Sequence, residues 1–393
     1  MKGASHSEVS TARPSLQLSL RDRLLGWRDG ILASARFQRF AGAFPLTRPV
    51  ARKRARALFD LCAGFVYSQV LLACVRLRLF ERLAEGPLSA SELAPRLSLS
   101  LESTTLLLNA ATSLKLVQKR SGNRYGLGPL GAALLGNPGV AAMVEHHAMF
   151  YEDLSDPVAM LRGKSGERLA NYWPYVAKDK TATLSHDEVA PYTALMSTSQ
   201  PMIAQQVIDA YDFRKHRCLL DVGGGDGAFL SAVGAHASDL RMVLFDLPAV
   251  ADRASERFRA SGLSKRAVAI GGSFLTDRLP DGADIVSLVR IIHDHDDDDV
   301  MTLLRAVRRA LPDHGTLLIA EPTSGLRGTA PISDAYFAFY LMAMGSGRPR
   351  TFAQIDAMLQ ASGFCSAKNL PSKIPLLTSV IVAKPYTGNV NRA

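Results

Sequence analysis

The 393-residue sequence predicts an α/β protein whose main domain is a doubly wound, mainly parallel sheet, preceded by a helical domain. Short apolar runs alternate with helical patterns from about residue 217 onward, and a glycine cluster directly follows the first run. The preceding region repeats its apolar residues near the helical period. Because one core rarely exceeds roughly 250–300 residues, we expect three parts: a basic arm over 1–56, a helical domain over 57–200 and the sheet domain over 201–393.

The positive charge is concentrated in the arm. Residues 1–56 hold 12 Lys and Arg against 3 Asp and Glu, whereas the remaining residues hold 34 against 33. Between residues 21 and 56, arginines interleave with apolar side chains such as Trp27 and Phe40. Three interpretations stay open: an exposed helix packed on its neighbours, a basic amphipathic segment on an anionic membrane surface, and a nucleic-acid contact.

The lack of a visible secretory signal and the pattern of the cysteines predict a cytoplasmic protein. No secretory signal is visible at the N-terminus. The longest apolar stretch, over residues 61–75, has 15 residues, whereas a spanning helix needs about 20. The four cysteines lack metal-ligand spacing and lie among apolar residues, so we expect buried free thiols in a reducing compartment.

The helical domain has the pattern of a winged helix. Apolar residues over 57–80 recur at helical spacing, and Ser89 with Glu92 forms a capping box that opens the next helix. A helix over 101–116 and a hairpin over 118–125 follow. Because residues 101–106 offer no Arg or Lys to contact bases, we expect this region to mediate dimerisation or another protein contact rather than DNA binding.

The sheet domain begins with a run of alternating strands and helices. Apolar runs predict the strands, and the longer amphipathic patterns between them predict the helices. The predicted strands are 218–222, 242–245, 267–270, 285–289, 316–320 and 376–383, and the predicted helices include 228–237 and 300–311.

A glycine motif at the end of the first strand predicts a nucleoside site. Asp221 precedes Gly223, Gly225 and Gly227, and glycines let the backbone turn sharply and approach a ligand closely. Asp246 ends the next strand, where a carboxylate can accept hydrogen bonds from both ribose hydroxyls. The spacing differs from the dinucleotide fingerprint, and an acid at the strand exit would repel pyrophosphate. S-adenosylmethionine (SAM) is therefore favoured over NAD(P) and over a purely structural turn.

A second motif predicts a general base. His293 and Asp294 follow the fourth strand, and a neutral imidazole there can accept a hydroxyl proton. Glu321 ends the fifth strand and can hold His293 in one tautomer. The alternatives are a metal site in the His/Asp cluster, a structural histidine and a solvated glutamate. Residues 297–299 are expected to cap the following helix.

Taken together, these residues resemble the SAM-dependent O-methyltransferases of the caffeate/hydroxyindole type, over roughly residues 57–385. The resemblance implies a class I methyltransferase domain, a winged-helix-like dimerisation domain, a homodimer, SAM as cofactor, and no nucleic-acid partner. It also implies that His293 and Asp294 are catalytic, with Glu321 as the supporting acid. A second supporting acid of the family corresponds to Pro349 and is absent here.

The resemblance further implies which residues contact the ligands. The cofactor-binding positions are Asp221, Gly223, Gly225, Gly227, Asp246, Gly272, Ser273, Phe274 and Arg290, with Ser273 in place of the family's usual Asp. Phe150, Trp173 and Met196 are expected to face the substrate.

More narrowly, the whole chain is similar to bacterial carotenoid O-methyltransferases. That similarity implies methylation of a hydroxyl at C1 of an acyclic carotenoid. The basic arm would then reach a membrane-resident substrate from the cytoplasm, by peripheral association with the inner or intracytoplasmic membrane. A methyltransferase for a soluble phenol or polyketide, and a non-catalytic SAM-binding regulator, remain as alternatives.

Overall fold

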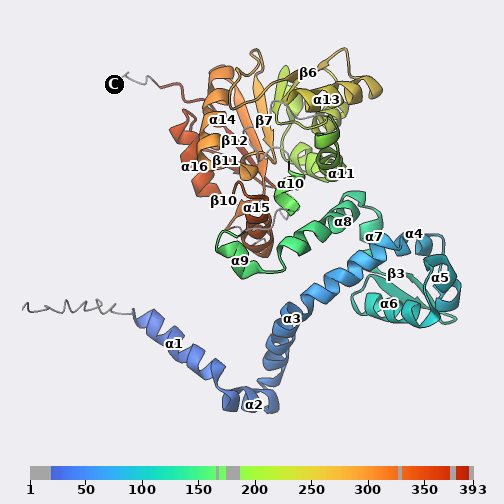
Figure 1. Cartoon of the computed structure of the whole chain (residues 1–393). Coiled ribbons are helices and arrows are strands. Elements are labelled where there is room, and N and C mark those ends of the chain that lie inside the picture. The colour runs from blue at the N-terminus through green and yellow to red at the C-terminus, as the bar shows by residue number, and fades with distance from the viewer. Residues whose placement is uncertain (1–18, 165–167, 174–185, 326–329, 372–377, 389–393) are drawn as a thin grey trace, which may run out of the picture. The chain divides into compact units, whose positions relative to one another are not determined.

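The computed structural model describes residues 19–164, 168–173, 186–325, 330–371 and 378–388. Its internal contacts divide the chain into two compact units, residues 1–71 and residues 72–393 (Figure 1). The predicted boundaries at 56/57 and 200/201 stay a prediction.

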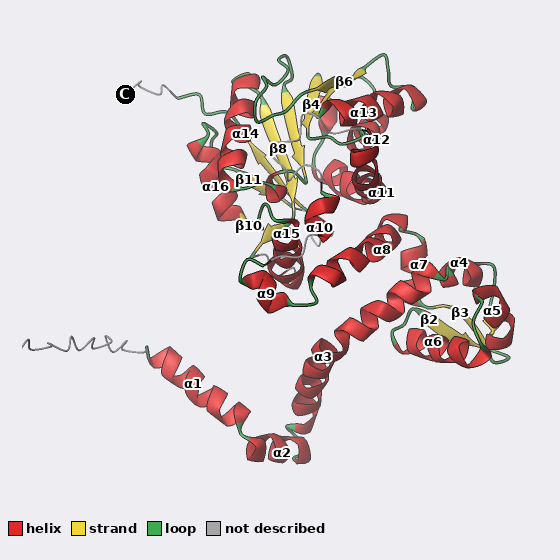
Figure 2. Ribbon diagram, viewed as in Figure 1, coloured by secondary structure: helices red, strands yellow, loops and turns green. Residues whose placement is uncertain are grey.

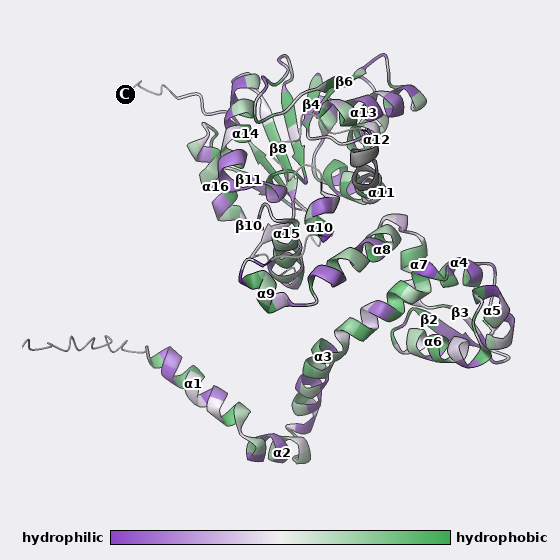
Figure 3. Cartoon of the chain, in the orientation of Figure 1, coloured by the Kyte–Doolittle hydropathy of each residue, from purple (hydrophilic) through white to green (hydrophobic). Residues whose placement is uncertain are grey.

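The first unit is helical and strongly exposed. Helix α1 (Leu20–Ala33) begins at Ser19, whose side chain accepts from the Asp22 backbone N–H, and α2 (Ala35–Ala43) begins likewise at Ser34. Polar and apolar residues alternate along α1 (Figure 3). Large apolar side chains are unusually exposed here: 70% of Trp27 and 81% of Leu61. Among the residues described in this unit, Ala41 alone is buried.

Helix α3 (Arg48–Arg76) crosses the boundary between the units and is longer than the sequence predicts. Its 29 residues include an 18-residue window with a mean hydropathy of 1.8, of which 17% is buried. The 15-residue apolar stretch is too short to span a membrane, but the helix that contains it is long and apolar enough to do so by length and composition. Length and composition alone assign no membrane span, because core helices and signal sequences meet the same criteria.

The winged-helix pattern is confirmed in the second unit. Ser89 and Glu92 form the predicted capping box, and the hairpin strands pair in antiparallel register in a sheet of order β1-β3-β2. The elements are α4 (Leu79–Ala84), β1 (Leu88–Ser89), α5 (Ala90–Leu97), α6 (Leu101–Ser113), β2 (Val117–Arg120) and β3 (Arg124–Leu127). Further helices follow: α7 (Pro129–Leu135), α8 (Pro138–Asp153), α9 (Pro157–Leu161), α10 (Arg168–Tyr172) and α11 (His186–Ala210).

The doubly wound sheet is also confirmed, with strand order β11-β12-β8-β7-β4-β5-β6 (Figure 2). Strands β4 to β8 are parallel, whereas β12 and β11 are antiparallel. The strands are β4 (Cys218–Val222), β5 (Arg241–Asp246), β6 (Ala267–Gly271), β7 (Ile285–Val289), β8 (Thr316–Glu321), β11 (Lys368–Leu370) and β12 (Ser379–Ala383). The predicted start of the last strand, at 376–377, lies outside the described residues.

Helices cover both faces of this sheet. Ile203 of α11, Phe229 of α12 (Ala228–His236) and Phe258 of α13 (Pro248–Ala260) pack in one core. Helices α14 (Asp297–Ala310) and α16 (Phe352–Ala361) contribute to the core on the other face. Because every residue of β4, β7 and β8 is buried, these strands are apolar runs rather than alternating ones.

Short elements connect these layers near the ends of the parallel strands. They are η3 (Phe213–Lys215), η4 (Ile292–Asp294), the π-helical turn η5 (Pro331–Phe337), α15 (Ala338–Met344), and the paired β9 (Thr323–Ser324) and β10 (Arg350–Thr351).

The prediction that all four cysteines are buried is wrong for two of them. Cys74 and Cys218 are buried, but Cys62 and Cys365 are exposed. Cys62 lies on the exposed part of α3, where apolar neighbours in sequence are themselves exposed, so an apolar surrounding did not indicate burial.

Candidate active site

The glycine turn after β4 brings the backbone close to the end of β5. Gly225 has φ +60°, a left-handed conformation that favours glycine, and a side chain there would meet nothing within 4 Å. Its N–H donates to Asp246 Oδ2 at 2.8 Å. The space above Gly225 is therefore open to a ligand, while the turn itself is fixed to the neighbouring strand.

Within the described ranges, Asp246 accepts its hydrogen bonds from backbone N–H groups. Besides the Gly225 contact, Oδ1 accepts from the Leu247 N–H at 2.7 Å. Burial raises the pKa of Asp246 to about 6, although these two hydrogen bonds oppose the rise. Each carboxylate oxygen can accept a second hydrogen bond. The group is thus suited to bind two hydroxyls, as a ribose offers.

Asp221 is the second buried carboxylate beside the glycine turn. It is 1% exposed, and Oδ1 accepts from Ser287 Oγ at 2.6 Å. Its Oδ2 is buried and finds no hydrogen-bond partner among the described residues. Burial raises the pKa of Asp221 to about 7. An orphaned carboxylate oxygen in a pocket wall fits a ligand that brings a cationic amino group, as SAM does.

One pocket joins most of the predicted ligand contacts. It is lined by Asp221, Gly223, Gly225, Asp246, Gly272, Ser273, Phe274, Arg290, Asp294, Met196 and Trp173. Gly227, Phe150, His293 and Glu321 do not line it. The structure therefore places the predicted cofactor residues other than Gly227 around one pocket, and their role there stays a prediction; the imidazole of His293 is not part of the lining.

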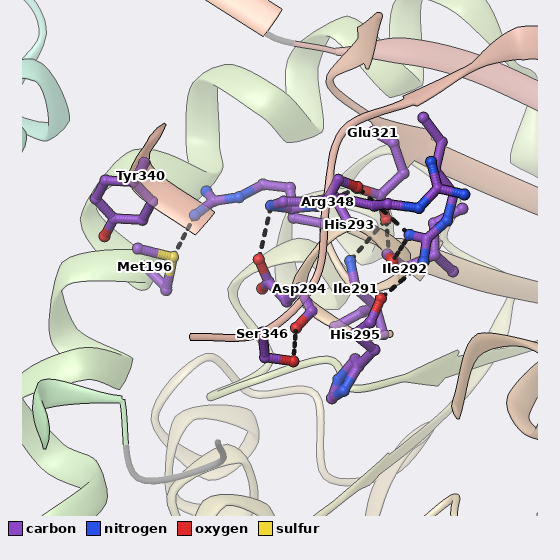
Figure 4. A network of polar contacts seen from close by, with 12 residues as sticks. Met196, Ile291, Ile292, His293, Asp294, His295, Glu321, Tyr340, Ser346 and Arg348 are labelled. Carbon is purple, nitrogen blue, oxygen red and sulfur yellow. Dashed lines mark hydrogen bonds and ion pairs between the residues drawn. The ribbon is translucent and has the colours of Figure 1, made fainter. Parts of the chain in front are cut away.

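The imidazole of His293 lies between two carboxylates in η4, at the exit of β7 (Figure 4). Nδ1 is hydrogen-bonded to Glu321, which is 1% exposed. Nε2 lies 2.9 Å from Asp294 Oδ1, a contact with the distance of an ion pair but not the direction of a hydrogen bond. Burial lowers the pKa of His293, but the two carboxylates outweigh burial and raise it to about 10.

Glu321 does more than hold the imidazole. Its Oε1 accepts from the backbone N–H groups of Ile291 and Ile292, at 2.7 and 2.8 Å. One carboxylate at the end of β8 therefore orients both the ring of His293 and the backbone that precedes it.

A group of aromatic residues includes one, Phe337, that contacts the ring of His293. Phe337 approaches its ring edge-on, with centroids 6.0 Å apart. Phe150 and Trp173 belong to the same buried cluster as Tyr340. His146 and His147 of α8 lie 2.7 and 2.8 Å from the hydroxyls of Tyr340 and Tyr336, respectively. These two contacts tie α8 to the segment that carries Phe337.

Arg290 and Ser273 have partners that the sequence did not reveal. Arg290 has φ +60°, and its guanidinium donates to Ser199 Oγ at 2.8 Å and to the sulfur of Met196. The Ser273 N–H donates to the carboxylate of Asp277 at 2.8 Å. Arg290 thus joins the strand exit to α11, and an aspartate four residues later caps the segment where the family's usual Asp is missing.

Ser287 is a site residue that the sequence did not predict. It is fully buried in β7 and is the Asp221 partner described above. The available signal was a single hydroxyl in an otherwise apolar strand.

As for the metal alternative, the described part of the chain contains no group of three or more His, Cys, Asp or Glu placed to hold an ion.

Comparison with known proteins identifies two family domains. Residues 151–365 match the O-methyltransferase domain, and residues 59–137 match the O-methyltransferase dimerisation domain. The chain is 42% identical to the demethylspheroidene O-methyltransferase of Cereibacter sphaeroides, over 95% of this chain and 98% of that protein. It is 40% identical to the enzyme of the same name from Rhodobacter capsulatus, over 90% of this chain and 88% of that one.

Solved structures show the same fold. The SAH-bound form of CalO1, a methyltransferase in calicheamicin biosynthesis, superimposes with a TM-score of 0.69 at 26% identity, covering 85% of this chain and 98% of that one.

Proposed function

The chain belongs to the SAM-dependent O-methyltransferase family, and we propose that it converts the C1 hydroxyl of an acyclic carotenoid, of the demethylspheroidene or hydroxyneurosporene type, into a methyl ether. The observation that carries the chemistry is the buried His293–Glu321 pair beside a pocket with two acidic side chains that form no ion pair among the described residues. The near full-length similarity to two demethylspheroidene O-methyltransferases supports the substrate class.

The pocket residues divide the work of holding SAM. Asp246 would bind the ribose, Asp221 the amino group, and the segment Gly272–Ser273–Phe274 the adenine. When bound, SAM supplies an electrophilic methyl group on a sulfonium. The protein mainly has to align the acceptor hydroxyl with that methyl, and alignment of this kind can contribute about 7–11 kcal/mol.

His293 would remove the proton of the acceptor hydroxyl. Glu321 engages Nδ1, so Nε2 is the nitrogen that would accept the proton. Without substrate the two carboxylates keep the ring protonated, so the ring would have to lose that proton and its contact with Asp294 before it can act as the base. Asp294 lies against Nε2, so it orients the ring before the hydroxyl takes its place there. Proton removal by such a base contributes about 10²–10⁴-fold in rate. A tertiary alcohol is less acidic than a phenol, so we expect proton loss and methyl transfer to occur together.

Incubation with labelled SAM tests the substrate. The purified protein would receive hydroxylated acyclic carotenoids in one set of reactions and soluble phenols and polyketides in another. We expect label in a carotenoid methyl ether. Label on phenols or polyketides alone would contradict the proposed substrate, and SAM binding without transfer to any acceptor would favour a regulatory role.

We also propose that residues 21–56 attach the enzyme to an anionic membrane surface on its cytoplasmic side. We further propose that the enzyme is a homodimer. Arg52, Lys53 and Arg54 are exposed on α3, and large exposed apolar side chains accompany them in the first unit. Each Lys or Arg near such a surface contributes about 1 kcal/mol. The dimerisation-domain match supports the homodimer.

Vesicle sedimentation tests the attachment. Replacing Arg52, Lys53 and Arg54 with Gln should weaken binding to phosphatidylglycerol vesicles by about 100-fold, since each charge contributes about 1 kcal/mol. The control replaces Lys119, Arg305 and Arg309, which are exposed in the second unit. Equal losses in both triple variants, or no loss in either, would contradict a membrane-binding arm.

A further inference from the structure

The loop that carries His293 is held from its carbonyl side by a segment more than fifty residues later, Ser346 to Arg350 (Figure 4). Ser346 Oγ donates to the Asp294 carbonyl at 3.0 Å, and the Arg348 N–H donates to the His293 carbonyl at 2.9 Å. The guanidinium of Arg350 donates to the carbonyls of residues 292 and 295. All four consecutive carbonyls from 292 to 295 therefore accept from this one segment.

Arg350 is an unusual residue for such a position, because its side chain is 1% exposed. A buried guanidinium is costly unless it is paired and its N–H groups are satisfied. Here it pairs with Asp297 at 2.6 Å, at the start of α14, and gives its remaining donors to the loop. The charge is therefore neutralised at one end and used to bind carbonyls at the other.

Gly347 brings the two backbones into direct contact. Its φ is +77°, and a Cβ at this position would lie 2.1 Å from the His293 carbonyl oxygen. No side chain fits there without moving the loop. The close approach of the two backbones thus depends on a glycine at this position, between α15 and β10.

The two sides of the loop are held by opposite charges. Glu321 binds its N–H groups at residues 291 and 292, and Arg350 binds its C=O groups at residues 292 and 295. A carboxylate suits donors, and a guanidinium suits acceptors. The short 3₁₀ turn of His293 lies between them and cannot rotate without breaking hydrogen bonds on one side.

We propose that Arg350 and Gly347 are positioning residues that hold the His293 imidazole in its reactive orientation through the loop backbone. They do so in a chain where Pro349 occupies the place of the family's second supporting acid. This inference rests on the proposed role of His293 as the base. Because misplacement of a catalytic group by about 1 Å can cost 10²-fold, loss of either residue should lower kcat by about that factor.

Arg350→Gln, with Arg350→Lys as the conservative variant, tests the proposal. The matched control is Arg308→Gln, because Arg308 also pairs with an aspartate and binds backbone carbonyls of the same domain, at Gly363 and Tyr386, away from the loop. We expect kcat to fall about 10²-fold in Arg350→Gln with KM for SAM unchanged. Arg350→Lys should retain part of the kcat that Arg350→Gln loses, and Arg308→Gln should lower the thermal midpoint without lowering kcat.

Gly347→Ala provides an independent test, with Gly363→Ala as its control. Gly363 also has a left-handed φ of +87°, but the atoms nearest to an added Cβ there belong to the flexible Arg308 side chain, the first at 3.4 Å. Gly347→Ala should lower kcat, whereas Gly363→Ala should change stability only. Equal kcat in both glycine variants, or a kcat loss in every variant that simply follows its loss of stability, would overturn the proposal.

A spectroscopic readout separates this inference from the proposed function. In ¹⁵N-histidine-labelled protein without SAM, the Nδ1 proton of His293 should give a downfield signal that shifts or broadens in Arg350→Gln but not in Arg308→Gln. If wild-type protein transfers no methyl group, the proposed function fails, and this signal still decides the role of Arg350. An unchanged signal in Arg350→Gln would overturn that role.

Discussion

The two halves of the active site bury similar numbers of acidic groups but balance their charge differently. At the ends of β4 and β5, Asp221 and Asp246 form no ion pair with Lys or Arg in the described part of the chain, and burial raises both pKa values. At the ends of β7 and β8, two carboxylates enclose His293 and raise its pKa. The base half therefore has a cation between its two carboxylates, whereas neither carboxylate of the cofactor half is ion-paired within the described residues, which suits a ligand with a cationic group.

This difference assigns separate tasks to the halves. Groups in the base half are held by one another before any ligand arrives, so a substitution there should affect turnover. Groups in the cofactor half have unused acceptor capacity, so a substitution there should affect affinity. Substitutions in each half can therefore test that separation.

His293→Ala should lower turnover by about 10²–10⁴-fold, because it removes the base while leaving the cofactor half intact. SAM affinity, measured by calorimetry, should stay within about twofold, since His293 does not line the cofactor pocket. His314→Ala is the control, because His314 is exposed. Turnover near that of wild type would remove His293 from the mechanism, and a large loss of SAM affinity would break the separation between the halves.

Asp246→Asn should weaken SAM binding about 10- to 100-fold, because hydrogen bonds to a charged group contribute about 1.5–3 kcal/mol. Only one of the Gly225 and Leu247 donors keeps an oxygen acceptor in the variant, because an amide has a single oxygen, so the thermal midpoint has to be measured beside the affinity to show that the turn survives. With saturating SAM, turnover should recover most of its wild-type value. Asp239→Asn, at an exposed position, serves as the control. Unchanged affinity would remove Asp246 from the ribose site.

Much of the fold was predictable because its strands are buried on both faces. β4 and β7 match the predicted bounds at 218–222 and 285–289, since a strand buried on both faces is a continuous apolar run whose ends are visible in the sequence. Parallel strands end at one edge of the sheet, so Asp221, Asp246 and Glu321 could be grouped from sequence alone. The capping box at Ser89 is a local pattern and was equally accessible.

Other features depend on contacts between distant segments, which a single sequence does not encode locally. Arg350 resembles an ordinary surface arginine until the loop at 292–295 meets it. The placement of Asp294 against Nε2 of His293 depends on a side-chain rotamer, which no spacing specifies. In the first unit, apolar periodicity predicted packing, yet Leu61 is exposed, because the periodicity of a helix does not identify what covers its apolar face.

The smallest expected effect concerns pH and stability in the cofactor half. The folded-state pKa of Asp221, about 7, is above the ordinary value of 3.8, so the folded protein favours the protonated carboxyl. Its contribution to stability is therefore complete below about pH 4 and is lost as pH rises toward 7.

Without SAM, raising the pH from 5 to 7.5 should thus lower the thermal midpoint of the wild type relative to that of Asp221→Asn, which cannot ionise at residue 221. A difference of about 2–4 °C corresponds to about 1 kcal/mol in a domain of roughly this size. Saturating SAM should reduce the difference, because its cationic amino group favours the ionised form. Identical pH dependence in the two proteins would mean that Asp221 is already neutralised by the fold, and the contrast between the two halves would not hold.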